Sequence, residues 1–166
     1  MSQTRQYDVL FLCTGNSARS VMAEALLKRW GKNKFNSYSA GSQPKGKVHP
    51  KTLETLKKND FDTVGFDSKS WDKLTEIDSP EMDIVITVCS NAANELCPIF
   101  PGKPFSLHWD IDDPARKFSS EKDQDDEFAR IFNEIEQRIK IFTNLMIENK
   151  DKNIFEYKLN EMSDPR

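Results

Sequence analysis

The stretch VLFLCTGNSARSVMAE, residues 9–24, brings a thiol, a loop of small residues and a guanidinium together within a short length of chain. Cys13 follows an apolar run, and Arg19 comes six residues later, where helix-forming residues begin. In a small-residue loop, with Gly15 free to take a positive φ, successive backbone N–H groups converge on one anion. A helix start adds free N–H groups and a positive dipole end, and an arginine adds a bidentate fork. The pattern predicts a site for a tetrahedral oxyanion formed by Thr14, Gly15, Asn16, Ser17, Ala18 and Arg19.

Cys13 lies at the floor of this predicted loop and is the candidate nucleophile. The same positive field is expected to lower the pKa of its thiol from about 8.5 toward neutrality or below, which would make it a thiolate. Ser20 is placed to donate a hydrogen bond to the sulfur. The alternative is a buried cysteine at a strand end, with Arg19 on the surface of an amphipathic helix. A Walker-type nucleotide loop is excluded, because no GxxxxGK[ST] string occurs in the chain.

Two further cysteines follow in the segment ITVCSNAANELCPIFPGKPFSLHWDIDDPA, residues 86–115. Cys89 ends an apolar run, and Cys97 comes after seven intervening residues. A neighbouring thiol can attack a thiolate that is bonded to an oxidised centre, leaving a disulfide that a third thiol resolves. This arrangement suggests a thiol relay. Zinc binding with His108 as a third ligand, and burial of both thiols as core residues, remain alternatives.

The pair Asp112 and Asp113, followed by Pro114, closes the same segment. A carboxyl group held in a loop by a following proline can reach over an anion and protonate a leaving oxygen as a general acid. The alternative is an ordinary turn without a chemical role. On its own, the DDP sequence favours the turn.

Apolar runs suited to strands alternate with helical patterns along the chain. We expect strands at residues 7–12, 36–40, 82–88 and 105–109, and helices at 18–30, 50–59 and 125–149. The last helix has an apolar face of Phe128, Ile131, Phe132, Ile135, Ile139, Phe142 and Met146. Such alternation predicts an α/β domain with a parallel sheet and right-handed crossovers.

Length and composition bound the class of protein. The 166 residues, with 24 basic and 27 acidic side chains, carry a net charge of −3, which argues against a nucleic-acid or anionic-membrane binder. The apolar run at residues 9–13 is too short for a signal peptide or a membrane span, so a cytoplasmic protein is expected. We expect one catalytic domain at residues 1–150. Residues 151–166 form a C-terminal extension, either a short docked helix or a frayed end.

Four motifs together resemble the arsenate reductases built on the low-molecular-weight phosphotyrosine phosphatase fold. They are CTGNSARS at 13–20, YSAG at 38–41, VCSNAANELCP at 88–98 and HWDIDDPA at 108–115. The similarity runs over most of the chain, from residue 7 to the middle of the last long helix. It implies a three-layer α/β fold with a four-stranded parallel sheet flanked by helices.

The resemblance also implies a mechanism. Cys13 attacks arsenate and forms a thiol-arseno adduct, while Arg19 and the loop amides hold the oxyanion and Asp113 helps water or hydroxide to leave. Cys89 then attacks Cys13, which releases arsenite and leaves a Cys13–Cys89 disulfide. Cys97 displaces Cys13 and moves the disulfide outward to Cys89 and Cys97, where thioredoxin reduces it. Thioredoxin, or alternatively glutaredoxin, is an external reductant, and no bound cofactor is expected.

The main competing function is a phosphatase acting on phosphotyrosine or a small phosphate ester through Cys13, Arg19 and Asp113. It needs neither of the later cysteines and usually has aromatic walls near the loop and the DP turn. Here no aromatic residue follows Pro114 directly, although Trp109 lies just before the turn. A non-catalytic oxyanion-binding or redox-sensing module is a third hypothesis.

Three features depart from the family pattern. The gap between Cys89 and Cys97 is one residue longer than usual. Some family members bind potassium near the loop through an Asn, a Ser and a carboxylate; Asn16 and Ser39 match, but Lys69 stands where the carboxylate would be. An ammonium there can substitute for the ion, so no metal is predicted. The polar insert at residues 117–126 and the C-terminal tail are extra, with no role assigned.

Overall fold

The sheet is the frame of the protein. The computed structural model describes residues 6–89, 100–148 and 152–165. Four parallel strands form one sheet in the order β2-β1-β3-β4, with bounds β1 Tyr7–Cys13, β2 Phe35–Gly41, β3 Ile84–Thr87 and β4 Phe105–His108. The predicted α/β class and four-stranded parallel sheet are confirmed. No helix in the described part of the chain has the length and apolar character needed to cross a membrane.

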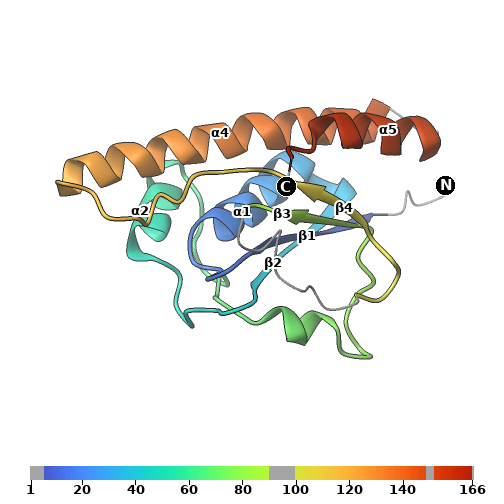
Figure 1. Cartoon of the computed structure of the whole chain (residues 1–166), viewed down its shortest axis with the longest axis horizontal. Coiled ribbons are helices and arrows are strands. Elements are labelled where there is room, and N and C mark those ends of the chain that lie inside the picture. Colours follow the sequence, from blue (N-terminus) through green and yellow to red (C-terminus); the bar gives the residue numbers. More distant parts are fainter. Residues whose placement is uncertain (1–5, 90–99, 149–151, 166) are drawn as a thin grey trace.

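In the described part of the chain, helices follow β1, β2 and β4. They are α1 Arg19–Gly31, α2 Pro50–Lys58, α4 Glu121–Glu148 and α5 Lys152–Met162, together with the 3-10 helices η1 Lys32–Lys34 and η2 Trp71–Leu74. Figure 1 shows α4 as a long helix that runs the length of the molecule, with α1 close to the sheet. Pro50 is the first residue of α2, where its missing N–H removes no helical hydrogen bond.

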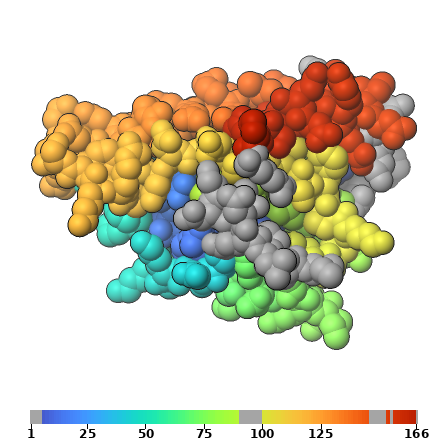
Figure 2. All heavy atoms as spheres, in the orientation of Figure 1, coloured from blue at the N-terminus to red at the C-terminus, as the bar shows by residue number. Residues whose placement is uncertain are grey.

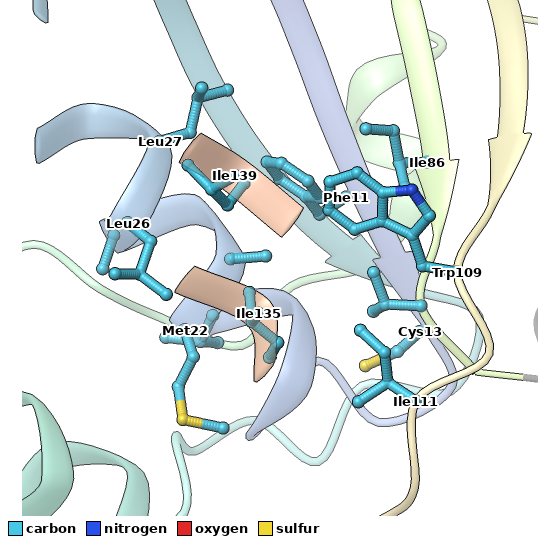
Figure 3. Close-up of a cluster of buried hydrophobic side chains, with 14 of the residues drawn as sticks. Phe11, Cys13, Met22, Leu26, Leu27, Ile86, Trp109, Ile111, Ile135 and Ile139 are labelled. Carbon is cyan, nitrogen blue, oxygen red and sulfur yellow. The ribbon is translucent and has the colours of Figure 1, made fainter. Parts of the chain in front are cut away.

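The side chains of β1 point alternately to the two faces of the sheet, and the core accordingly has two parts. Val9, Phe11 and Cys13 face the main cluster, which also holds the buried residues of α1 and α4, while Leu10 and Leu12 face a smaller cluster. Figure 3 shows the main cluster, where Cys13 lies beside Ile111 and Trp109. The smaller cluster includes Leu74 of η2 and Phe100. The oxyanion loop therefore starts from a strand that is buried on both faces.

β3 and α4 differ most in length from the sequence predictions. β3 is shorter than the predicted 82–88, and α4 begins at Glu121 instead of residue 125. Ser120 accepts a hydrogen bond from the amide of Asp123 through Oγ, which caps the start of α4. Most of the insert assigned to residues 117–126 thus belongs to the start of this helix. The predicted apolar face of α4 is buried from Phe128 to Phe142, and the side chain of Met146 lies outside the described residues.

The C-terminal segment docks on the body of the protein. α5 follows α4, and in Figure 2 the two helices form one continuous side of the molecule. Leu159 is fully buried in the main cluster. After the helix, the amide of Asp164 donates to the carbonyl of His108 at 2.7 Å, and Ser163 Oγ accepts from the amide of His108 at 3.0 Å. The docked helix is the alternative that the structure favours, and a domain boundary at residue 150 stays a prediction.

Candidate active site

The candidate site lies where the carboxyl ends of β1 and β3 meet. β1 pairs with β2 on one side and with β3 on the other, so the strand order reverses at this point, which is where α/β sheets bind ligands. Leu12 pairs with Thr87, which puts Cys13 and Cys89 on the same rim of the sheet. Both thiols are buried, and Thr14 Oγ1 lies 3.7 Å from Cys89 Sγ.

The carbonyls of the loop after Cys13 are engaged in hydrogen bonds with neighbouring segments of the chain. The carbonyl of Thr14 accepts from the amide of Gln43, and that of Gly15 accepts from the amide of Lys45 and from Ser68 Oγ. The carbonyl of Ser17 likewise accepts from the amide of His49. In a planar trans peptide the N–H points opposite to the C=O. The amides of the following residues are therefore directed away from these hydrogen-bond partners, an arrangement compatible with an anion site.

The start of α1 continues this line of donors. Its cap position, Ala18, provides no side-chain hydrogen bond, and the first turn of α1 contains no acidic residue. Apart from the amide of Ser20, which hydrogen-bonds to the Cys13 sulfur, the first amides and the positive dipole end of the helix have no acidic or capping side chain from the helix itself. An oxyanion bound in front of Ala18 would satisfy them.

Asn16, and not Gly15, carries the left-handed backbone in the loop. The sequence predicted a positive φ at Gly15, but among the described glycines positive φ occurs elsewhere, whereas Asn16 has φ 45°. The fully buried Asn16 side chain holds this conformation: Oδ1 accepts from the amide of Lys69 at 2.9 Å, and Nδ2 donates to Ser20 Oγ and Ser39 Oγ at 2.8 and 3.0 Å. Gly15 instead provides room, because a Cβ there would lie 3.3 Å from Lys45 Cε.

Ser20 connects this buried network to the nucleophile. Its Oγ lies 3.0 Å from Cys13 Sγ and accepts from Asn16, which leaves the hydroxyl proton for the sulfur. On the other side, Ser39 Oγ donates to Glu24 Oε1 at 2.6 Å, and Glu24 pairs with Lys28. Sequence reasoning did not find the role of Glu24. The signal was present, because a carboxylate one turn after Ser20 interrupts an otherwise apolar helix face.

Gly41 at the end of β2 is a second residue that sequence reasoning missed. A Cβ added to it would lie 2.8 Å from the carbonyl oxygen of Cys13, 3.0 Å from the amide nitrogen of Asn16, and closer still to the carbonyl oxygen of Thr14. Only glycine allows β2 to approach the loop this closely. The YSAG motif contains the signal, since a glycine closes a strand that pairs with β1.

Arg19 and Asp113 face each other across the cleft. Arg19 Nη1 donates to the carbonyl of Ile111 at 2.9 Å, and Nη2 lies 3.9 Å from Asp113 Oδ2. Asp113 Oδ1 also accepts from the amide of Ala115 at 2.9 Å, so the carboxylate is fixed by its own turn. The neighbouring Asp112 pairs instead with Arg130 of α4 at 3.0 Å. The two aspartates thus separate, and only Asp113 belongs to the cleft.

The cleft itself has a volume of about 270 Å³ and suits a small anion. It is lined by Cys13, Thr14, Gly15, Ser17, Ala18, Arg19, Gln43, Lys45, Asp113 and Ala115. All predicted oxyanion-binding residues line it except Asn16, which supports the loop from behind. None of the described residues that line the cleft is aromatic.

The protonation state of Cys13 differs from the sequence expectation. Burial raises the pKa of the Cys13 thiol above its ordinary value, and the nearby Cys89 adds to this effect. The hydrogen bond with Ser20 and the positive charge of Arg19 lower the pKa but do not offset burial. The predicted lowering of this pKa is therefore wrong for the ligand-free cleft. The sequence showed the positive groups but not the depth of burial.

Three further residues that the sequence analysis named lie outside the cleft lining or outside the described residues. Cys97 lies outside the described residues. His108 is buried, and its Nδ1 lies 2.8 Å from Thr87 Oγ1, so this nitrogen is engaged within the sheet. The ammonium of Lys69 pairs with Asp67 at 2.8 Å, and it is the backbone amide of Lys69 that contacts Asn16. The expected substitution of this ammonium for a potassium ion gains no support from these contacts.

The fold and the loop define a family. The family model for low molecular weight phosphotyrosine protein phosphatases matches residues 8–153, and the chain belongs to this family. Within it, the chain is similar to arsenate reductase 2 of Staphylococcus saprophyticus, with 40% identity over 138 residues, 81% of this chain and 94% of that protein. The resemblance to arsenate reductases that the motifs indicated is thereby confirmed.

Solved structures agree with this assignment. A crystal structure of an arsenate reductase from Archaeoglobus fulgidus matches with a TM-score of 0.62 and 29% identity, over 82% of this chain and 98% of that one. A thioredoxin-dependent arsenate reductase of Corynebacterium glutamicum matches with a TM-score of 0.63 and 24% identity, over 89% of this chain and 66% of that one. The second match shows the shared fold.

Proposed function

We propose that the protein is an arsenate reductase that converts arsenate to arsenite by thiol chemistry and is regenerated by thioredoxin. The observation that carries the proposal is the pair of buried thiols, Cys13 and Cys89, on adjacent strand ends beside an oxyanion cleft, with Thr14 in contact with the second thiol. A phosphatase needs only the first thiol. Similarity to arsenate reductases supports the same conclusion.

Arsenate binding and nucleophilic attack form the first step. The amides of the loop and the guanidinium of Arg19 bind the dianion. Burial raises the pKa of the Cys13 thiol, which favours the thiol over a thiolate beside a bound dianion. The proton passes to an oxygen of HAsO₄²⁻ as the sulfur attacks arsenic, and Ser20 donates to the sulfur during this change. An S–As bond forms, an As–O bond breaks, and the products are Cys13–S–AsO₃²⁻ and water.

Asp113 assists departure of the water. Its carboxylate lines the cleft on the side of Arg19, where it can accept the proton of the Cys13 thiol and pass it to the leaving oxygen, so no second proton is needed. Its turn is held by the hydrogen bond to the amide of Ala115. Asp113 is therefore proposed as the general acid, with Asp112 excluded by its pairing with Arg130.

Reduction of arsenic is the second step. The thiolate of Cys89 attacks Sγ of Cys13, an S–S bond forms, and the S–As bond breaks with its electron pair remaining on arsenic. Arsenic(V) becomes arsenic(III) and leaves as arsenite, which takes up the proton lost by Cys89. The two thiols supply the two electrons. In the third step Cys97, on the basis of the sequence resemblance, attacks the sulfur of Cys89 and frees Cys13. The dithiol of thioredoxin then reduces the Cys89–Cys97 disulfide.

A phosphatase activity is the second candidate, because the family includes phosphotyrosine phosphatases and the cleft holds the required Cys13, Arg19 and Asp113. Phosphate and arsenate share charge and shape, so the loop separates them poorly. The absence of aromatic residues among the described lining favours a small oxyanion over phosphotyrosine. We expect hydrolysis of aryl phosphates as a side reaction.

The test is NADPH oxidation on addition of arsenate to the protein with thioredoxin and thioredoxin reductase. We compare the wild type with Cys89→Ser and Cys97→Ser, and we measure aryl phosphate hydrolysis by the same three proteins. Arsenate-dependent turnover that both substitutions abolish, with hydrolysis retained, is the expected result. No reduction by the wild type with thioredoxin, or with glutaredoxin and glutathione, alongside equal hydrolysis by all three proteins, would contradict the proposal and leave the phosphatase.

A further inference from the structure

Lys45 lies beside the oxyanion loop although nothing in the sequence motifs marks it. The amide of Gln43 donates to the carbonyl of Thr14 at 2.9 Å, and the amide of Lys45 donates to that of Gly15 at 3.0 Å. Ser68 Oγ also donates to the carbonyl of Gly15 and accepts from the amide of Gly46. These bonds fix the backbone on both sides of Lys45 against the loop. The position of Lys45 is thus set by the fold.

The stem of Lys45 crosses Gly15 and enters the lining of the cleft. Cγ and Cε of Lys45 lie 3.4 and 3.3 Å from the point where a Cβ on Gly15 would be. These contacts show that the stem of Lys45 packs closely against Gly15. A four-carbon stem held along the loop brings the ammonium to the cleft, which Lys45 helps to line.

The charge of Lys45 is not neutralised by a carboxylate within ion-pair distance among the described residues. Other lysines near the site are paired, Lys51 with Glu121 and Asp125, and Lys69 with Asp67. Arg19 shares its guanidinium with Asp113 and a carbonyl. The field of Lys45 also acts on its surroundings: burial lowers the pKa of His49, and the positive charge of Lys45 lowers this pKa further.

We propose that Lys45 is a substrate-binding residue that selects free tetrahedral oxyanions over phosphate monoesters. This inference rests on the proposed function and deepens it. The loop amides and Arg19 bind the oxygens nearest Cys13, which leaves one oxygen facing the cleft mouth. In a free oxyanion that oxygen accepts a hydrogen bond from the ammonium of Lys45. In a monoester the same oxygen bears a carbon group. The hydrogen bond from the ammonium is then weakened, and the carbon group displaces water that hydrates the ammonium, which costs free energy.

The test uses Lys45→Met, which keeps the stem and removes the charge, and Lys45→Arg, which keeps a charge. Lys47→Met is the matched control, because Lys47 belongs to the same exposed loop but does not line the cleft. The probe is inorganic phosphate, whose Kd is measured by calorimetry, and the KM for an aryl phosphate is measured in parallel. Thermal unfolding confirms that each variant is folded.

We expect Lys45→Met to raise the phosphate Kd by about tenfold, the order of one hydrogen bond to a charged group at a partly exposed site. Lys45→Arg and Lys47→Met should keep the phosphate Kd within about twofold of wild type, and the aryl phosphate KM of Lys45→Met should rise by clearly less than its phosphate Kd. An unchanged phosphate Kd in Lys45→Met, an equal loss in Lys47→Met, or an equal rise in the ester KM would each overturn the proposal. Phosphate binding requires neither thioredoxin nor turnover, so failure of arsenate reduction in the wild type would be recognised separately.

Discussion

Gly41→Ala should damage the site without acting on any reacting group. The added methyl would lie 2.8 Å from the carbonyl oxygen of Cys13 and 3.0 Å from the amide nitrogen of Asn16. Both are backbone atoms, so they cannot move aside as a flexible side chain would. An ordinary contact begins at 3.4 Å, which means that the oxyanion loop and β2 must separate by about 0.6 Å or more.

A displacement of this size affects catalysis more than stability. Misplacement of reacting groups by about 1 Å can cost roughly 100-fold, so we expect kcat/KM for aryl phosphate hydrolysis to fall by about 30- to 100-fold. Overpacking is expected to cost about 1–3 kcal/mol in the free energy of unfolding. The assay compares kcat/KM and denaturant unfolding of the same protein samples.

Gly65→Ala provides the matched control for this substitution. Gly65 has φ 94° with nothing within 4 Å of an added Cβ, so the change strains the backbone but fills no contact near the site. We expect a loss of about 1–2 kcal/mol in stability and a change in kcat/KM within about twofold. If Gly41→Ala keeps the wild-type kcat/KM, or loses no more than Gly65→Ala, the close approach of β2 to the loop does not position Cys13.

Three further perturbations test single contacts. Ser20→Ala removes a hydrogen bond that lowers the pKa of Cys13, so the pH profile of alkylation by iodoacetamide should move to higher pH. A shift to lower pH would contradict the assignment of Ser20 as the donor to the Cys13 sulfur. Asp113→Asn should reduce kcat for aryl phosphate hydrolysis by about 100-fold, whereas Asp112→Asn should leave it within about twofold, and equal effects would refute the assignment of the general acid. Asp164→Ala should lower the free energy of unfolding by about 1 kcal/mol in a denaturant titration, with no change in hydrolysis.

The elements that position the site could be predicted because their signals are local. β1 and β3 are apolar runs, α1 and α4 have apolar faces at helical spacing, and Pro50 marks the start of α2. The early start of α4 was missed because residues 121–126 are charged and show no apolar period. The features that indicate this start are the capping residue Ser120 and the acidic residues of the first helical turn.

The chemistry of the site was less predictable where it depends on packing between distant segments. Cys13 and Arg19 are found from their spacing, but the raised pKa of Cys13 depends on burial by several elements. Glu24 supports the loop only because β2 brings Ser39 against α1. Lys45 reaches the cleft through hydrogen bonds between two loops that are remote from each other in sequence. No pattern within one segment reports such contacts.

The docking of Ser163 and Asp164 on β4 has a consequence for association between molecules. β4 is an edge strand, and the amide and carbonyl groups on its free side are able to accept a strand from another chain. Here both backbone groups of His108 bond to the C-terminal segment, and the amide of Asp110 donates to Asp164 Oδ2. The edge is therefore covered at its carboxyl end by the chain's own residues. Loss of these residues would open a site for strand addition, and with it a route to aggregation, at the strand that leads into the Asp113 turn.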